Sequence, residues 1–140
     1  MNNAEVAEAL FAALADGNDT AVRGLCSDEL CVRQNNGRPF GLDALLAFNT
    51  AVGQIVKAFR YENAVRSATT TGFVEEHAVR GTLPCGTTLD LLVCVVADVC
   101  GGRVTHVREY FDSAAAADLI AVLGSIAPTE PLPSAPSNLS

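Results

Sequence analysis

The stretch that decides the fold is residues 73–112, FVEEHAVRGTLPCGTTLDLLVCVVADVCGGRVTHVREYFD. Within it, Pro84-Cys85-Gly86 and Gly101-Gly102 are turn signals, and the runs between them alternate apolar and polar residues. A further alternating run lies just upstream. These signals predict four long antiparallel strands, over residues 59–67, 73–83, 87–100 and 103–112. The run 87–100 is long enough that we expect a bend or bulge in it.

The N-terminal half has helical spacing instead. Val6, Leu10 and Leu14 fall on one stripe of a helix that Gly17 ends, and Asn18 or Asp19 can cap the next helix. The predicted helices cover residues 4–16 and 20–25, a third segment starting at or just before Asp43, and residues 114–123, with a short strand over 30–35.

Helices gathered on one side of a curved sheet define an α+β domain. We therefore expect a cone-shaped, curved antiparallel sheet packed against the N-terminal helices, with an apolar interior that suits a small ligand. This domain is expected over residues 1–126. Residues 127–140 are rich in Pro and Ser and are expected to form a flexible tail.

The chain of 140 residues has 9 Lys and Arg against 16 Asp and Glu, for a formal net charge of −7. This balance argues against nucleic acid or an anionic membrane surface as partner, because both need a basic footprint. No apolar stretch is long enough to span a membrane, and residues 1–16 lack the basic start of a secretory signal, so we expect a cytoplasmic protein. The five cysteines form no CxxC pair, and no nucleotide fingerprint is present. We expect free thiols, no metal site and no cofactor.

Glu109 is the most informative residue. Successive strand residues point to opposite faces, and the odd positions Val107, Glu109 and Phe111 form the more apolar face of the run 103–112. A carboxylate in an apolar wall is costly unless it is paired or protonated, and burial raises its pKa toward values useful in acid–base chemistry. The alternatives are that Glu109 faces outward, or that it forms a structural ion pair with an arginine.

His77 is the second candidate. The odd face of the run 73–83 is the more apolar one, which would turn His77 inward toward Glu109 as base, acid or orienting group. The opposite orientation would place Glu76 and Arg80 inside, and would give a Glu109–Arg80 pair.

Polar and apolar residues of the neighbouring runs complete the expected pocket. Tyr61 and Asn63 share the apolar face of the run 59–67, and Asn35 ends the short strand; each could donate a hydrogen bond to a ligand oxygen. The full set of expected substrate-binding residues is Asn35, Tyr61, Asn63, Arg80, Leu91, Val93 and Phe111.

The opposite, outer face is also partly apolar. It is expected to carry His106, Arg108 and Tyr110 beside Leu92, Cys94 and Val96. The C-terminal helix or a second subunit could cover it, so a homodimer is expected. Asp112 is expected to act as a cap or turn residue.

Residues 76–112 resemble the SnoaL-like branch of the nuclear transport factor 2-like superfamily. The likeness lies in a strand ending GTLP, a Pro-x-Gly hairpin, a Gly-Arg-Val turn and a closing REYFD strand, and GLDALLAF resembles the helix after the first strand. The resemblance spans about residues 3–124 and implies a cystatin-like barrel.

Within that superfamily the chain is similar to limonene epoxide hydrolases, through LPxG and R-[DE]-Y-F-D. That likeness implies an Asp–Arg–Asp set with a Tyr and an Asn, of which the closing acid falls on Glu109 and the Asn on Asn35. The Tyr falls on Arg33. The Arg and second Asp fall either on Glu76 and Ala78 or on His77 and Val79, so the set is broken.

Because an acid with His77 suits enolisation, isomerisation or ring closure, SnoaL-like cyclases and ketosteroid isomerases are the better analogy. The expected function is a cofactor-independent acid–base enzyme, an isomerase, cyclase or hydrolase, acting on a small apolar oxygenated molecule through Glu109 and His77. The alternatives are a non-catalytic protein that binds such a ligand, and an assembly module whose interior is filled by side chains.

Overall fold

The structure is a computed structural model that describes residues 1–126. Its elements in chain order are α1 (Asn3–Asp16), α2 (Asp19–Leu25), β1 (Cys26–Gln34), α3 (Leu42–Ile55), β2 (Lys57–Ala68), β3 (Gly72–Thr82), β4 (Thr88–Cys100), β5 (Arg103–Phe111) and α4 (Ala117–Ile126). The predicted order of helices and strands and the α+β class are confirmed. The tail predicted for 127–140 lies outside the described residues.

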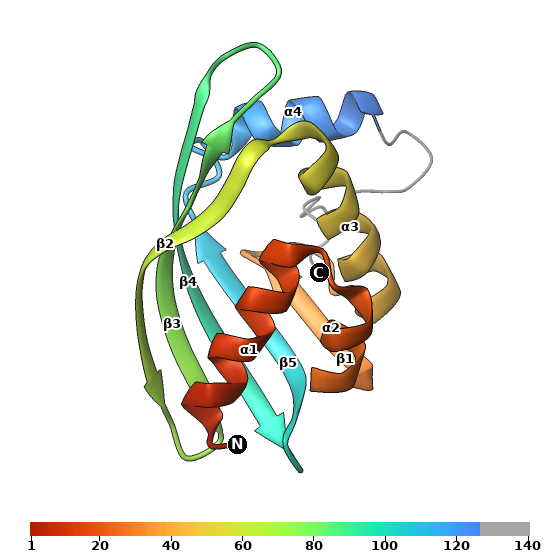
Figure 1. Ribbon diagram of the computed structural model, residues 1–140, viewed down its shortest axis with the longest axis vertical. Coiled ribbons are helices and arrows are strands. Elements are labelled where there is room, and N and C mark those ends of the chain that lie inside the picture. Colours follow the sequence, from red (N-terminus) through yellow and green to blue (C-terminus); the bar gives the residue numbers. More distant parts are fainter. Residues whose placement is uncertain (127–140) are drawn as a thin grey trace.

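The five strands form one curved sheet in the order β1-β5-β4-β3-β2 (Figure 1). Strands β2 to β5 form the predicted antiparallel meander. The register shift between β4 and β5 at Asp98 and Val99 leaves the extra residue, Thr105, on β5, so the bulge lies in β5 and not in the run 87–100 where it was predicted. β1 instead pairs parallel with β5, because α3 carries the chain from β1 to the opposite edge of the sheet before the meander begins. The sheet is therefore mixed, and it stays open between β1 and β2. The α+β class and the curved sheet are as expected, but the parallel β1 differs from the antiparallel sheet predicted, and the sheet does not close into a barrel.

The first three helices cover the concave side of the sheet, and α4 crosses one end of the cone (Figure 1). α1 packs on β2 and β3 through its predicted apolar stripe, and α3 packs on β1 and β2. Gly17 ends α1 in the left-handed conformation, with φ of 67°, and the Asn18 side chain accepts the Ala21 N–H at 3.1 Å to cap α2. No helix in residues 1–126 is long and apolar enough to cross a membrane.

Two boundaries differ from those predicted. β1 starts at Cys26, before the predicted residue 30, and its pairing with β5 shifts register between Cys26 and Cys31. α4 starts at Ala117, three residues later than predicted, because residues 113–116 form turns. Asp112 has the expected turn role, and its carboxylate accepts the Ala114 N–H at 2.9 Å.

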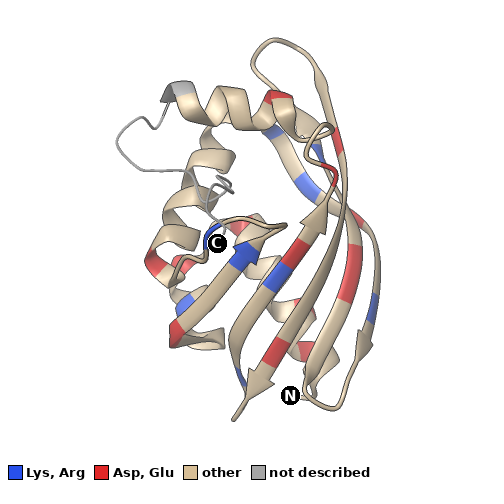
Figure 2. Cartoon of the chain, turned by 180° about the vertical axis from the view of Figure 1, so that it is seen from behind, with Lys and Arg blue, Asp and Glu red and all other residues tan. Residues whose placement is uncertain are grey.

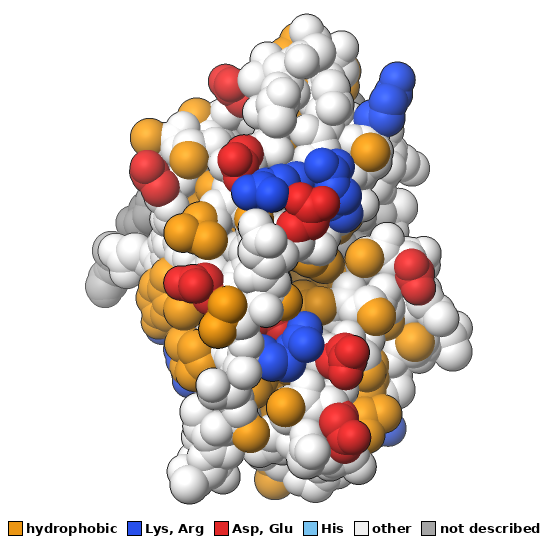
Figure 3. Space-filling model, turned by 60° about the vertical axis from the view of Figure 1, so that its left-hand side comes forward, with side chains coloured by type: hydrophobic (Ala, Val, Ile, Leu, Met, Phe, Trp, Pro, Cys, Tyr) orange, Lys and Arg blue, Asp and Glu red, His pale blue; other side chains and the backbone are white. Residues whose placement is uncertain are grey.

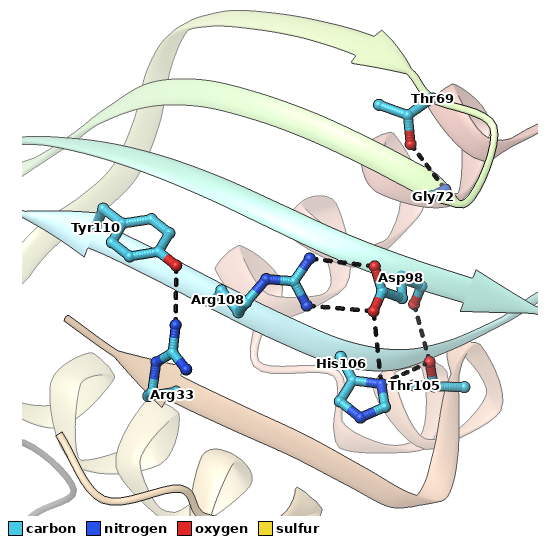
Figure 4. A network of polar contacts seen from close by, with 8 residues as sticks. All are labelled: Arg33, Thr69, Gly72, Asp98, Thr105, His106, Arg108 and Tyr110. Carbon is cyan, nitrogen blue, oxygen red and sulfur yellow. Dashed lines mark hydrogen bonds and ion pairs between the residues drawn. The ribbon is translucent and has the colours of Figure 1, made fainter. Parts of the chain in front are cut away.

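The outer face of the sheet carries the predicted polar residues of β5. Arg108 donates two hydrogen bonds to Asp98, each 3.2 Å long, and Arg33 donates to the Tyr110 hydroxyl at 2.9 Å (Figure 4). Seen from behind, basic residues lie scattered among acidic ones (Figure 2). On the β2–β3 side, hydrophobic side chains separate small groups of opposite charges (Figure 3).

The C-terminal helix does not cover this outer face, contrary to one of the two expectations. α4 packs on α3, and its Leu119 and Ile120 face the interior of the cone. Leu92 is 64% exposed as a result.

Gly72 at the start of β3 leaves no room for a side chain next to the β4 backbone. A Cβ atom built there would lie 1.8 Å from the carbonyl oxygen of Ala97, a backbone atom that cannot move without breaking the ladder. We expect Gly72→Ala to lower the free energy of unfolding by about 2 kcal/mol or more, because overpacking displaces backbone. Gly53→Ala is the matched control: it lies in α3 with open space around its Cβ position and should stabilise by about 0.5–1 kcal/mol. Urea denaturation measures both, and equal effects would contradict this reading of Gly72.

Candidate active site

One row of residues runs across all five strands on the concave face. Gln34 on β1 pairs with Glu109 on β5, Glu109 with Val95 on β4, Val95 with Glu75 on β3, and Glu75 with Arg66 on β2. Neighbouring strands lie about 4.8 Å apart, so the backbones of Glu75 and Glu109 are separated by about 10 Å with Val95 between them. The row therefore places two carboxylates in one apolar wall.

Glu109 lies on the inner face, as its alternation predicts. Gln34 Nε2 donates a hydrogen bond to Glu109 Oε1 at 2.9 Å. Among the described residues Glu109 forms no ion pair with Lys or Arg, so the alternative of a structural pair with Arg80 is wrong. Burial raises the pKa of Glu109, and this effect exceeds the opposing effects of the Gln34 hydrogen bond and of nearby His77.

His77 also faces inward and is fully buried. Its Nδ1 lies 2.7 Å from Glu75 Oε2, and Glu75 Oε1 accepts a hydrogen bond from Arg66 Nε at 2.7 Å. Glu75 itself is 0% exposed. The alternative orientation of β3 is wrong, because Glu76 is exposed.

Arg80 lies on the outer face, where it contacts Glu62 at 2.8 Å and Asp90 at 3.2 Å. Those two carboxylates keep the pKa of Arg80 raised. It is therefore remote from the ligand-binding position expected from the sequence.

Aromatic rings pack around His77. The ring centroid of Tyr61 lies 4.6 Å from that of His77, and the ring of Phe11 on α1 lies 4.8 Å from it, edge to face. Burial, followed by the charges of Glu109 and Glu75, raises the pKa of Tyr61. The phenol thus remains a hydrogen-bond donor, and its hydroxyl has no partner among the described residues.

A cavity of about 90 Å³ lies between these groups and the helices. Six residues expected from the sequence line it: Tyr61, His77, Leu91, Val93, Glu109 and Phe111. A larger hollow of about 490 Å³ adjoins it at the ends of β1 and β5 and the start of α4, and shares Gln34, Phe111, Ala116 and Ile120 with it. Glu109 is only half-buried, because the cavity opens outward.

Two other expected ligand-binding residues lie outside the cavity. Asn63 is exposed with φ of 59°, at a register shift of β2 between Glu62 and Val65. Asn35 lines the outer hollow instead, and its side chain ties the end of β1 to β5 by accepting the Phe111 N–H at 2.9 Å and donating to Ser113 at 3.3 Å.

Sequence reasoning missed Gln34, Glu75, Arg66 and Asn49 as site residues. Glu75 shares the odd face with Phe73 and His77, and Gln34 continues the alternation of Leu30 and Val32, so both had a usable signal. Arg66 had none, because the register shift in β2 sets its orientation. Asn49 is a helical residue that lines the cavity while donating to the Leu14 carbonyl at 2.9 Å.

Comparison with known proteins establishes the fold. No protein-family model and no curated protein matches the sequence, whereas many solved structures match the coordinates. An NTF2-like protein from Burkholderia xenovorans LB400 matches with a TM-score of 0.71 at 19% identity, over 83% of this chain and 93% of that one. The chain therefore has the nuclear transport factor 2-like fold, as the sequence resemblance implied.

Two further matches carry names that suggest activities. A candidate polyketide cyclase from Pseudomonas putida KT2440 has a TM-score of 0.73 at 20% identity, over 82% of this chain and 95% of that one. An LEH-like epoxide hydrolase of M. tuberculosis has a TM-score of 0.65 at 19% identity, over 89% and 95%. At these identities the similarity defines the fold and leaves the reaction to the site.

The raised pKa of Glu109 predicts how stability depends on pH. An acid whose pKa is higher in the folded state stabilises the fold fully below its unfolded pKa, and this contribution is lost as the pH rises through the folded value. The free energy of unfolding of the parent should therefore fall relative to that of Glu109→Gln as the pH rises above about 4.5. Urea denaturation across the pH range measures the difference. Exposed Glu76→Gln is the control, and a pH-independent difference for Glu109→Gln would contradict the assignment.

Proposed function

We propose that the protein is a cofactor-independent acid–base enzyme of the isomerase or cyclase type, acting on a small neutral oxygenated molecule. The observation that carries the proposal is that His77 and Glu109 face one apolar cavity while each is held by different partners. Groups whose environments differ in this way suit opposite roles in proton transfer.

The lining of the cavity defines the substrate class. Its walls are mainly aliphatic and aromatic, and the polar side chains among them are Gln34, Asn49, Tyr61, His77 and Glu109. Within residues 1–126 no Lys or Arg lines it, so a carboxylate or phosphate on the substrate would be buried without a counter-charge from them. A neutral carbonyl compound avoids that cost, and Tyr61 offers its oxygen a donor.

Such a substrate needs one proton removed and one returned. One of the pair His77 and Glu109 takes a proton from the carbon next to the carbonyl, which leaves the electron pair in an enolate stabilised by a donated hydrogen bond. The other gives a proton to carbon. The substrate balances in atoms and charge without a co-reactant, because the product is its isomer or ring-closed form. The side chain that gained a proton then releases it to water and the one that lost a proton takes one from water, which restores the enzyme for the next turnover.

Epoxide hydrolysis has less support. The acid–Arg–acid set that the resemblance implies is not assembled here: Val95 separates the two carboxylates, and in the described part of the chain Arg66 forms an ion pair with Glu75 and not with Glu109. A water molecule activated between them would lack a bridging arginine.

The test is isomerisation of a β,γ-unsaturated cyclohexenone to its conjugated form, followed by ultraviolet absorbance. We expect Glu109→Gln and His77→Gln each to lower kcat by on the order of 10²–10⁴-fold while keeping the fold, because a positioned acid or base contributes about that much. Glu76→Gln is the matched control on the outer face of β3 and should retain activity.

A parent rate no higher than that of equal concentrations of free acetate and imidazole would contradict catalysis on this class of substrate. A rise in melting temperature with the saturated ketone, without turnover of the unsaturated one, would indicate the alternative, a ligand-binding protein. Full activity of Glu109→Gln would remove Glu109 from the mechanism.

The proposal extends to a homodimer formed through the outer sheet face. Leu92 and Tyr110 are 64% and 42% exposed on that face, and a second copy would remove them from water. We expect Leu92→Lys to shift the sedimentation coefficient from that of a dimer to that of a monomer. A parent protein that sediments as a monomer would contradict the homodimer.

A cytoplasmic location remains a prediction.

A further inference from the structure

We infer that Glu75 and Arg66 are positioning residues that keep the His77 proton on Nδ1 and leave its Nε2 bare toward the cavity. His77 is then the proton acceptor and Glu109 the donor. The assignment of these two roles rests on the proposed function, whereas the position of the histidine proton stands on the geometry alone.

The first step is the ionisation of Glu75. Its Oε1 lies 2.7 Å from Arg66 Nε, and the guanidinium is charged at every physiological pH. A carboxylate that is 0% exposed needs such a counter-charge, because an unpaired buried charge costs several kcal/mol. Arg66 is itself 26% exposed and reaches solvent at its other side. Glu75 is therefore a buried carboxylate held in an ion pair.

The second step is the tautomer of His77. An ionised carboxylate accepts hydrogen bonds and has no hydrogen to donate. The contact of 2.7 Å between Glu75 Oε2 and His77 Nδ1 therefore requires the hydrogen to be on Nδ1. A neutral imidazole carries one N–H, so Nε2 has a free lone pair.

The third step is the direction in which Nε2 points. No described residue forms a hydrogen bond with Nε2, yet no buried side-chain nitrogen or oxygen of the described residues lacks a partner. His77 is 1% exposed as a whole, so Nε2 keeps some of that small accessible surface, and the cavity that His77 lines is the space it meets. Phe11 and Tyr61 pack against the ring and hold this orientation.

The fourth step compares the two ends of the row. The groups that face His77 are Glu75 on its own strand, Tyr61 on β2, Glu109 on β5 and Phe11 on α1. Glu109 has a neutral amide as its partner, and that amide occupies Oε1, which leaves Oε2 for the acid proton. The ionised Glu75, paired with Arg66, favours the role of proton acceptor for His77. The neutral Gln34 amide beside Glu109 favours the role of proton donor for Glu109.

The local sequence builds this arrangement through a bulge. Tyr61 pairs with Val79, but after the register shift Arg66 pairs with Glu75, where unbroken pairing would place it opposite Val74. Asn63, with its φ of 59°, lies within the shifted segment. The bulge thus turns Arg66 inward onto Glu75.

The tautomer can be measured without any ligand. The chain has two histidines, so in a His106→Gln background the imidazole ¹⁵N signals belong to His77 alone; His106 is exposed on the outer face. At a pH where His77 is neutral we expect a protonated Nδ1 and an unprotonated Nε2. A proton on Nε2 in this folded protein would overturn the inference outright.

Glu75→Gln makes the sharper test. Arg66 can only donate, so it keeps the amide oxygen of the new Gln and turns the amide NH₂ toward His77. That NH₂ must donate to Nδ1, and the histidine proton is expected to move to Nε2. Arg66→Lys, which keeps the charge, and Glu76→Gln, on the outer face, should keep the parent tautomer. An unchanged tautomer in Glu75→Gln would overturn the positioning role.

Turnover of the β,γ-unsaturated ketone separates this inference from the proposed function. We expect Glu75→Gln to lower kcat by on the order of 10²-fold or more with little change in KM. Arg66→Lys, which keeps the positive charge, should retain most of the parent rate. A parent that fails to turn over the ketone while showing the expected tautomer would contradict the proposed function and leave the positioning intact. Full activity of Glu75→Gln despite a moved proton would overturn the assignment of His77 as acceptor.

Discussion

The interior of this cone is organised by the need to compensate one buried carboxylate. Glu75 has no contact with water and lies on a face otherwise built from residues such as Phe73 and Val95. Arg66 supplies the opposite charge and His77 the second hydrogen bond. Removing either partner would leave a buried acceptor unsatisfied, at a cost of about 1–3 kcal/mol or more. The orientation of the imidazole follows from this requirement.

Glu109 shows what the same sheet does without a compensating cation. It is one strand beyond Val95 on the same row, yet its only side-chain hydrogen bond among the described residues comes from Gln34. The raised pKa follows from that difference in partner, because desolvation then favours the neutral acid. Glu75 and Glu109 lie in one wall but have different partners, because the edge strand β2 supplies an arginine to Glu75 and the edge strand β1 supplies an amide to Glu109.

The sequence predicts the fold well because turn residues and alternation are local signals. Pro84-Cys85-Gly86 and Gly101-Gly102 delimit the meander, and alternation places His77 and Glu109 inside. Alternation stops predicting the face of a side chain where one extra residue changes the register. Asn63 is expected in the pocket if the alternation is unbroken, but the bulge in β2 places Asn63 outside and Arg66 inside. The parallel pairing of β1 and the position of α4 depend on contacts between distant segments, which no local pattern encodes.

The shape of the interior bears on the proposed substrate class. The cavity beside Glu109 and His77 has about 90 Å³. The adjoining hollow is several times larger and includes Asn35 and Ser113, which bring polar groups to its wall. A molecule whose small carbonyl end enters the cavity, and whose larger part stays in the hollow, would use both spaces. Because Gln34 lines both spaces and also donates to Glu109, a ligand that filled both spaces would contact the side chain that holds the acid.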